Sequence, residues 1–416
     1  MDSKRLFSSL EKLNFVRVSR TEEERKAAQI ILKEIEDAGG QGYIEKFDVS
    51  DWKIKTQKFY VNSPIYKEYD VTGYGCCANT NGPLTAPFYY FDTFTKVSRE
   101  KAKDKIVLVN GYLTYDTYKE IASSGAVGFI TFSNDVYEDE TNSDLDVREL
   151  RKLMSDIKKL PGVHMRSKDA MDLVKLNPET VTIEIEQEEF VSQSQNVIST
   201  IKGKMLEEEI VITAHYDSVP FSRGVYDNGA GSAIILELYR YFTNNKPLRT
   251  LRFIWCGSEE RGLLGSKAFV KKHNKELKNI ILCLNVDVAG PVLGKDSIVV
   301  MANDPAVKFI EEYRNKIEYV CDVKSDTYSS DSIPFADKGI PGLNFMRFGT
   351  QGTAHIHTRK DTLYFMSEDA LYNTYKYVLK FTNHFANVEE FPIARKIDRK
   401  MKDKICKYLK KRKKDK

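Results

Sequence analysis

The sequence lacks the features that mark several special classes of protein. No apolar run reaches the roughly 18 to 20 residues that a membrane-spanning helix needs, and the first 15 residues contain no continuous apolar stretch like that of a signal peptide. The six cysteines have neither the paired spacing of a disulfide scaffold nor that of a thiolate zinc site. These absences predict free thiols and a cytoplasmic protein.

The composition is that of a folded protein with an uneven distribution of charge. The 416 residues, of which 41% are hydrophobic and 30% charged, suffice for two or three domains. Residues 395–416 carry 13 Lys or Arg against 3 Asp, so the rest of the chain is negative although the whole is +4. In this tail apolar residues recur every fourth position, at Ile397, Met401, Ile405 and Leu409.

This periodicity predicts a short basic amphipathic helix at the C-terminus. The simpler interpretation is a solvated helix. The alternative is a weak contact with an acidic surface or a membrane. Nucleic-acid binding is not expected, and the sequence does not determine how many subunits assemble.

Hydrophobic patterns along the chain predict an α/β protein. Residues 21–38 have the pattern of an amphipathic helix capped by Thr21, and the alternating residues 42–49 have that of a strand. After about residue 208, strands alternate with helices, which predicts a largely parallel sheet covered on both faces. We expect a discontinuous domain of residues 1–84 and 171–394, a small α/β insert of residues 85–170, and the basic tail of residues 395–416.

Polar residues follow successive predicted strands at the point where each strand ends. In α/β sheets, ligands gather at the carboxyl ends of the strands, so these side chains are expected to lie close together. Singly, each residue has an ordinary explanation as a helix cap or a buried polar group. The ordered set is His215 with Asp217, then Asp227, Glu259 with Glu260, Asp287 and, after a later strand, His357.

Histidines and carboxylates together form a ligand set for zinc, cobalt or manganese, and two imidazoles suit two sites. Asp227, next to two glycines, can bridge both ions, and Asp217 can hold the ring of His215. Glu259 and Glu260 are adjacent, so one can bind metal while the other accepts a proton. Hydrolysis of a peptide bond is the chemistry that this arrangement suits.

The motifs AHYDSV, YDNGAGSA, GSEERGLLGS, LNVDVAG, SSDSIPFADKGIPGL and HTRKDTL resemble the di-zinc aminopeptidase family of aminopeptidase Y and bacterial leucyl aminopeptidase, which is related to glutamate carboxypeptidase. The resemblance covers about residues 195 to 385. It implies a three-layer α/β sandwich around a mixed, largely parallel sheet. Residues 100–170 resemble the protease-associated insert of such proteins.

The resemblance also implies a role for each site residue and a cis peptide bond after Asp227. Glu259 would be the general base for attack by a metal-bridging hydroxide, and Asp217 would orient His215. Two Zn²⁺ ions are expected, with Co²⁺ or Mn²⁺ as alternatives. One zinc would be held by His215 and Asp287, the other by Glu260 and His357, with Asp227 bridging them.

The chain departs from the family pattern at two positions. Ile356 stands where many members have an aromatic residue, and Ser332 replaces a more usual His or aromatic residue, so the specificity pocket is not predicted. His355 is a rival to His357, but the HTRKDT register favours His357.

The expected activity is that of an aminopeptidase acting on peptides. A carboxypeptidase on the same scaffold is an alternative, for which Arg223, Arg261 or Arg347 would bind the terminal carboxylate. A receptor-like homologue without catalysis is a second alternative, although all five ligands and the base are present. A one-zinc glutaminyl cyclase relative is disfavoured because both metal sites are retained.

Overall fold

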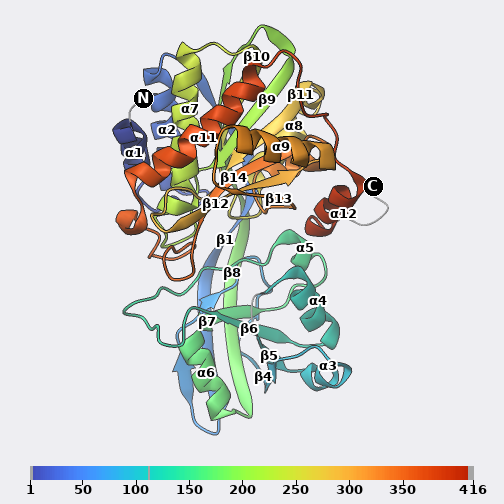
Figure 1. The fold of residues 1–416 in the computed structure, drawn as a ribbon. Helices are drawn as coiled ribbons and strands as arrows, with labels where there is room; N and C mark the ends of the chain where they lie inside the picture. The colour runs from blue at the N-terminus through green and yellow to red at the C-terminus, as the bar shows by residue number, and fades with distance from the viewer. Residues whose placement is uncertain (1–2, 111–112, 411–416) are drawn as a thin grey trace. The chain divides into compact units, whose positions relative to one another are not determined.

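The computed structural model describes residues 3–110 and 113–410, which divide into two compact units. The first unit comprises residues up to 49 and from 193 onward, and the second comprises residues 50–192. Two strands of 22 residues, β1 (Gly42–Ser63) and β8 (Thr180–Ile201), each continue from one unit into the other (Figure 1). The predicted insert, residues 85–170, lies inside the second unit. This unit is wider because it also contains residues 50–84 and 171–192, which include parts of β1 and β8.

The first unit contains a mixed, largely parallel sheet, which confirms the predicted fold class. Its strand order is β13-β12-β14-β11-β9-β10-β8. The four central strands are parallel, whereas β12 and β8 pair antiparallel with their central neighbours. The strands are β9 (Met205–His215), β10 (Arg249–Cys256), β11 (Ile280–Val286), β12 (Gly294–Met301), β13 (Asp322–Ser325) and β14 (Gly342–Gly349).

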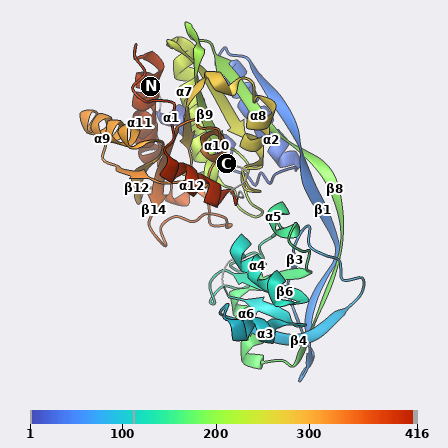
Figure 2. The same cartoon turned by 90° about the vertical axis from the view of Figure 1, so that its right-hand side faces the viewer.

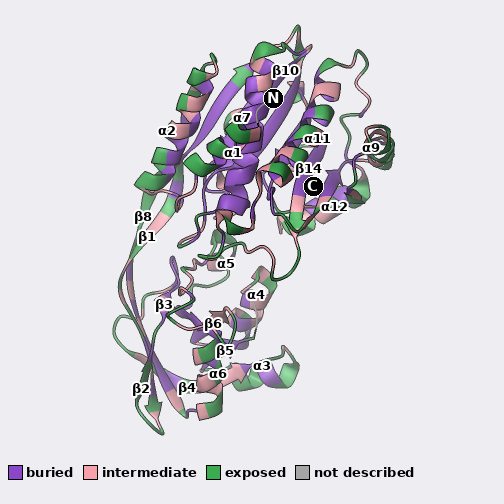
Figure 3. Ribbon diagram, turned by 60° about the vertical axis from the view of Figure 1, so that its left-hand side comes forward, coloured by how far each residue is buried: buried purple, intermediate pink, exposed green. Residues whose placement is uncertain are grey.

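Helices cover both faces of this sheet, so the first unit has three layers (Figure 1). Figure 3 shows that α7 is buried along most of its length, whereas α2 has an exposed side. The predicted helix 21–38 is confirmed as α2, which begins after the cap Thr21 and buries Ala27, Ile31 and Ile35. One face carries α1 (Ser3–Lys12), α2 (Glu22–Asp37), α7 (Ala230–Asn244), α9 (Asp304–Lys316) and α11 (Glu368–Asn387); the other carries α8 (Leu264–Lys272) and α10 (Ser332–Asp337).

The second unit is a smaller α/β structure with its own hydrophobic core. Its central strands β4, β5, β6 and β7 are parallel. Its elements are β2 (Lys67–Tyr69), β3 (Thr72–Gly73), β4 (Leu84–Phe91), α3 (Lys96–Ala102), β5 (Ile106–Val109), α4 (Tyr115–Ser124), β6 (Gly128–Ser133), α5 (Lys152–Ser155), β7 (Gly162–Arg166) and α6 (Ser167–Leu176).

The described part of the basic tail forms helix α12 (Arg399–Tyr408), which confirms the predicted amphipathic helix. Its apolar residues Met401 and Ile405 are buried in a cluster with Leu263 and Ile333. Figure 2 shows α12 beside α10. The apolar residues of the four-residue repeat therefore pack against other residues of the first unit. Contact of the basic side with an acidic surface stays a prediction, and residues 411–416 lie outside the described residues.

This packing predicts the effect of shortening a buried side chain of α12. Ile405→Ala is expected to lower the free energy of unfolding by about 2 to 4 kcal/mol, because it removes buried methyl groups and leaves a cavity. Lys402→Ala, on the exposed side of the same helix, is expected to change it by less than about 0.5 kcal/mol. Urea denaturation measures both. Equal effects of the two changes would mean that α12 does not pack as described.

Two further features concern the class of protein. Among the helices of residues 3–110 and 113–410, none combines the length and the apolar character that crossing a membrane requires. None of the six cysteines, all of which lie within the described residues, forms a disulfide bond, and five of them are buried. The cytoplasmic location stays a prediction.

Candidate metal centre

All the predicted site residues lie in the first unit, at or just beyond the carboxyl ends of its parallel strands. His215 is the last residue of β9, and Asp287 follows β11. Glu259 and Glu260 lie in the turn after β10. Asp227 lies in the short segment η1 (Val225–Gly229) before α7, where the Asp227–Asn228 peptide bond is cis, as the resemblance implied. His357 lies in the loop after β14.

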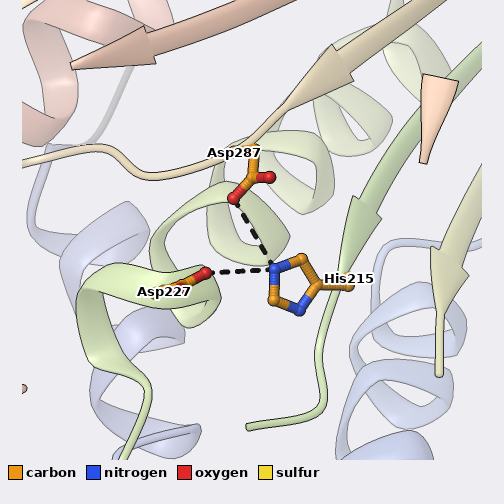
Figure 4. A group of neighbouring side chains, drawn as sticks. All are labelled: His215, Asp227 and Asp287. Carbon is orange, nitrogen blue, oxygen red and sulfur yellow. Dashed lines mark hydrogen bonds and ion pairs between the residues drawn. The ribbon is translucent and has the colours of Figure 1, made fainter. Parts of the chain in front are cut away.

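The first group of side chains consists of His215, Asp227 and Asp287 (Figure 4). His215 Nε2 lies 3.2 Å from Asp227 Oδ1 and 3.6 Å from Asp287 Oδ1. All three side chains are buried. One nitrogen and two carboxylate oxygens therefore point to a common position, the arrangement expected of ligands to one metal ion.

The second group consists of Asp227, Glu260 and His357. His357 Nε2 lies 3.0 Å from Asp227 Oδ2 and 3.1 Å from Glu260 Oε2. Asp227 thus presents one oxygen to each group. The His357 side chain is 49% exposed, so this side of the centre is open to solvent. His355, the rival candidate, packs its ring near Phe365 instead.

Unsatisfied oxygens test whether these residues fit metal ions. Within the described residues, Asp287 Oδ1 and Glu260 Oε1 are buried and have no hydrogen-bond partner. Buried carboxylate oxygens without partners are costly, and a cation bound at each group would remove that cost. The donor set of imidazole nitrogens and carboxylate oxygens is one that zinc accepts. The residues therefore fit a pair of divalent ions.

The electrostatics of the centre show an excess of negative charge. Burial is the main cause that raises the pKa of Glu259 well above its usual value, with Glu260 and Asp331 adding to the effect. Burial lowers the pKa of His215, but the carboxylates, Glu259 first, outweigh it and hold that pKa well above the usual value. The carboxylate of Glu260 is the largest cause that raises the pKa of His357 to about 12. Bound cations would compensate this excess.

Asp217 connects the histidine to the glutamate turn. His215 Nδ1 lies 3.3 Å from the main-chain oxygen of Asp217 and 3.6 Å from its Oδ1. The Asp217 carboxylate accepts hydrogen bonds from the main-chain N–H groups of Glu259, at 2.9 Å, and Glu260, at 3.3 Å. Besides lying beside the imidazole, as predicted, Asp217 therefore fixes the main chain of both glutamates, which the sequence did not indicate.

The sequence analysis missed two buried residues that shape the centre. Asp361 accepts hydrogen bonds from the main-chain N–H groups of Tyr226, at 2.8 Å, and Asp227, at 3.1 Å. The Arg17 guanidinium donates to the main-chain oxygens of Tyr216, at 2.6 Å, and Gly224, at 2.9 Å. Asp361 lies in the HTRKDTL motif, so the sequence could have identified it as a candidate. Arg17 could not be found in this way, because it binds main-chain oxygens, which are present at every position of the sequence.

Comparisons with known proteins show similarity to peptidases. Residues 196–382 match the family model described as Peptidase family M28. The chain is 29% identical over 371 residues to aminopeptidase YwaD of Bacillus subtilis (strain 168), covering 85% of this chain and 78% of that protein. It is 23% identical over 354 residues to carboxypeptidase Q of Mus musculus, covering 79% and 73%.

A solved structure shows the same fold. The structure of BSAP, a zinc aminopeptidase from Bacillus subtilis, has a TM-score of 0.77 to this chain at 24% sequence identity. The match covers 95% of this chain and 99% of that chain. The structural similarity therefore includes both units, whereas the residues matched by the family model, 196–382, all lie in the first unit.

Proposed function

We propose that the chain is a member of peptidase family M28, whose model matches residues 196–382, and that it is a two-zinc aminopeptidase, which releases single residues from the N-termini of peptides. A member of this family is a metallopeptidase, a hydrolase of peptide bonds. The number of ions and the end of the peptide that is cut belong to the proposal. The observation that carries it is the Asp227 carboxylate, one oxygen of which contacts His215 and the other His357.

We assign the ligands by these contacts. His215 and Asp287 would hold one zinc ion, Glu260 and His357 the other, and Asp227 both. Bound there, zinc would lower the pKa of a water molecule and polarise the scissile carbonyl, as cobalt or manganese would. Asp217 would keep His215 Nδ1 protonated, which leaves Nε2 free to bind metal.

Glu259 is assigned as the general base. Its neighbour Glu260 faces His357 and belongs to the second group of ligands, whereas Glu259 belongs to neither group. A carboxylate that holds no metal ion can accept a proton from the attacking water and keep it during the reaction. Glu259 would then pass this proton to the nitrogen of the leaving amine. The adjacent glutamates would thus divide metal binding and proton transfer between them.

The charge of the site favours an aminopeptidase over a carboxypeptidase. The carboxylates around the centre favour a substrate end that is a cation, such as the N-terminal ammonium group. Arg347, one candidate for binding a C-terminal carboxylate, already donates to Asp296 Oδ2 at 2.7 Å and to the main-chain oxygen of Pro291 at 2.9 Å. The similarity to carboxypeptidase Q keeps the carboxypeptidase as the alternative to be tested.

Blocked peptides and metal analysis test the proposal. The purified full chain is expected to bind about two zinc ions and to hydrolyse aminoacyl anilides and C-terminally blocked peptides. Acetylation of the N-terminus should abolish cleavage. Cleavage of N-terminally blocked peptides alone would support the carboxypeptidase. Bound zinc without hydrolysis of any peptide would support the non-catalytic homologue.

A further inference from the structure

Glu24 is a fully buried carboxylate next to the turn that carries the two glutamates of the centre. Its Oε2 accepts a hydrogen bond from the main-chain N–H of Arg20 at 2.6 Å, and its Oε1 accepts one from Ser194 Oγ at 2.7 Å. Ser19, the residue before Arg20, shares a hydrogen bond between its hydroxyl group and that of Ser258 in the turn. Burying a carboxylate costs free energy that an apolar side chain would avoid. Glu24 therefore has a role other than filling the core.

The position of Glu24 in α2 supports this conclusion. It is the third residue of the helix, where a glutamate in a capping box would bond back to the N–H of the cap residue. Thr21 does cap the N–H of Glu24, at 3.3 Å, but the Glu24 side chain bonds to Arg20 and reaches Ser194, 170 residues away in sequence. The Glu24 side chain therefore makes a long-range contact and does not bond back to the cap residue Thr21.

The turn from Gly257 to Glu260 needs external support. Ser258 has φ +54°, a left-handed conformation that is unfavourable for a residue with a side chain. A Cβ atom on Gly257 would lie 2.8 Å from Glu24 Oε1, so the turn and the carboxylate are in close contact. Asp217 holds the next residue, Glu259, through its main-chain N–H. Two carboxylates thus contact this strained turn on either side of Ser258, Glu24 at Gly257 and Asp217 at Glu259.

We propose that Glu24 is a positioning residue for the general base Glu259. It acts on the turn through its contact with Gly257 and through its bond to Arg20, whose neighbour Ser19 is bonded to Ser258. The proposal rests on the proposed function for the role of Glu259. Without this carboxylate, the main-chain N–H of Arg20 loses its acceptor and a cavity opens beside Gly257, so the left-handed turn relaxes. A displacement of about 1 Å at a catalytic group is enough to slow a reaction by about 100-fold.

The test compares Glu24→Ala and Glu24→Gln with a matched control. Glu237 is also a buried glutamate, but it pairs with Arg5 and Arg240 and has no contact with the turn. Glu24→Ala is expected to lower kcat about 10- to 100-fold while KM stays within about 3-fold and the zinc content is unchanged. Glu24→Gln keeps one acceptor oxygen and should lie between Glu24→Ala and the wild type. Glu237→Gln is expected to lower Tm while kcat per folded molecule is unchanged.

Amide hydrogen exchange adds a measurement that is independent of activity. The segment Gly257–Glu260 should exchange faster in Glu24→Ala than in the wild type or in Glu237→Gln. Wild-type kcat together with wild-type exchange in the turn would overturn the proposal. If Glu24→Ala does not fold, Glu24→Gln decides by the same two measurements. If the wild-type chain cuts no peptide, the proposed function is wrong. If residues 257–260 exchange slowly in every variant, Glu24 does not support the turn, and the positioning role is wrong.

Discussion

Replacing Glu259 by glutamine is expected to lower kcat by about 100- to 10,000-fold, the range typical for loss of a general base. Glutamine keeps the size of the side chain but cannot accept a proton at neutral pH. The metal content should remain at about two zinc ions per chain, because Glu259 belongs to neither group of ligands. Steady-state kinetics on aminoacyl anilides and metal analysis of the same sample check the result.

Glu260→Gln is the matched control for this change. It makes the same substitution one residue later, but Glu260 Oε2 lies 3.1 Å from His357 Nε2 in the second group of ligands. This variant should lose activity together with about one zinc ion per chain. Full activity in Glu259→Gln would refute its role as the base. Loss of zinc in both variants to the same extent would refute the division of roles between the two glutamates.

Asp227→Ala is expected to lose both zinc ions and to reduce activity by about 1,000-fold or more. Asp227 is the one residue that belongs to both groups of ligands, so its removal weakens both sites at once. Metal ions typically contribute several kcal/mol to stabilising the transition state, and each 1.36 kcal/mol corresponds to a factor of ten in rate. Metal analysis after dialysis, together with activity at saturating zinc, measures both effects.

Asp287→Asn is the matched control for Asp227→Ala, because Asp287 belongs only to the group with His215. It should lower the metal content to about one zinc ion per chain and leave the second site occupied. Retention of two ions in Asp227→Ala would contradict the bridging role. Equal metal loss in the two variants would show that the sites fill together, and the separate assignment of ligands would then be wrong.

Several features of the molecule were predictable because their signals are local. The cap at Thr21 and the apolar spacing that follows predicted α2, and the four-residue repeat from Ile397 predicted α12. The alternation of strands and helices predicted a largely parallel, covered sheet, since each element repeats its own hydrophobic period, and the resemblance implied that the sheet is mixed. Polar residues at strand ends predicted a common site because parallel strands end at one edge of the sheet.

Other features depend on contacts between distant parts of the chain. The insert of residues 85–170 was predicted from changes of pattern, whereas the two compact units divide within β1 and β8, which are single unbroken strands. The repeat in the tail showed which residues of α12 are apolar, but not that they pack against the residues after the glutamate turn. Neither feature leaves a local pattern, because both depend on which surfaces meet after folding.

The sequence by itself determined the elements, the order of the motifs and the residue types available for metal binding and proton transfer, because each of these is encoded by neighbouring residues. Only the tertiary structure decided which oxygen of Asp227 faces each histidine, and that Arg17 and Glu24, from the N-terminal segment, contact the site. The supporting contacts join side chains to main-chain groups about 200 residues away. Main-chain groups are the same at every position, so no sequence pattern identifies the partner.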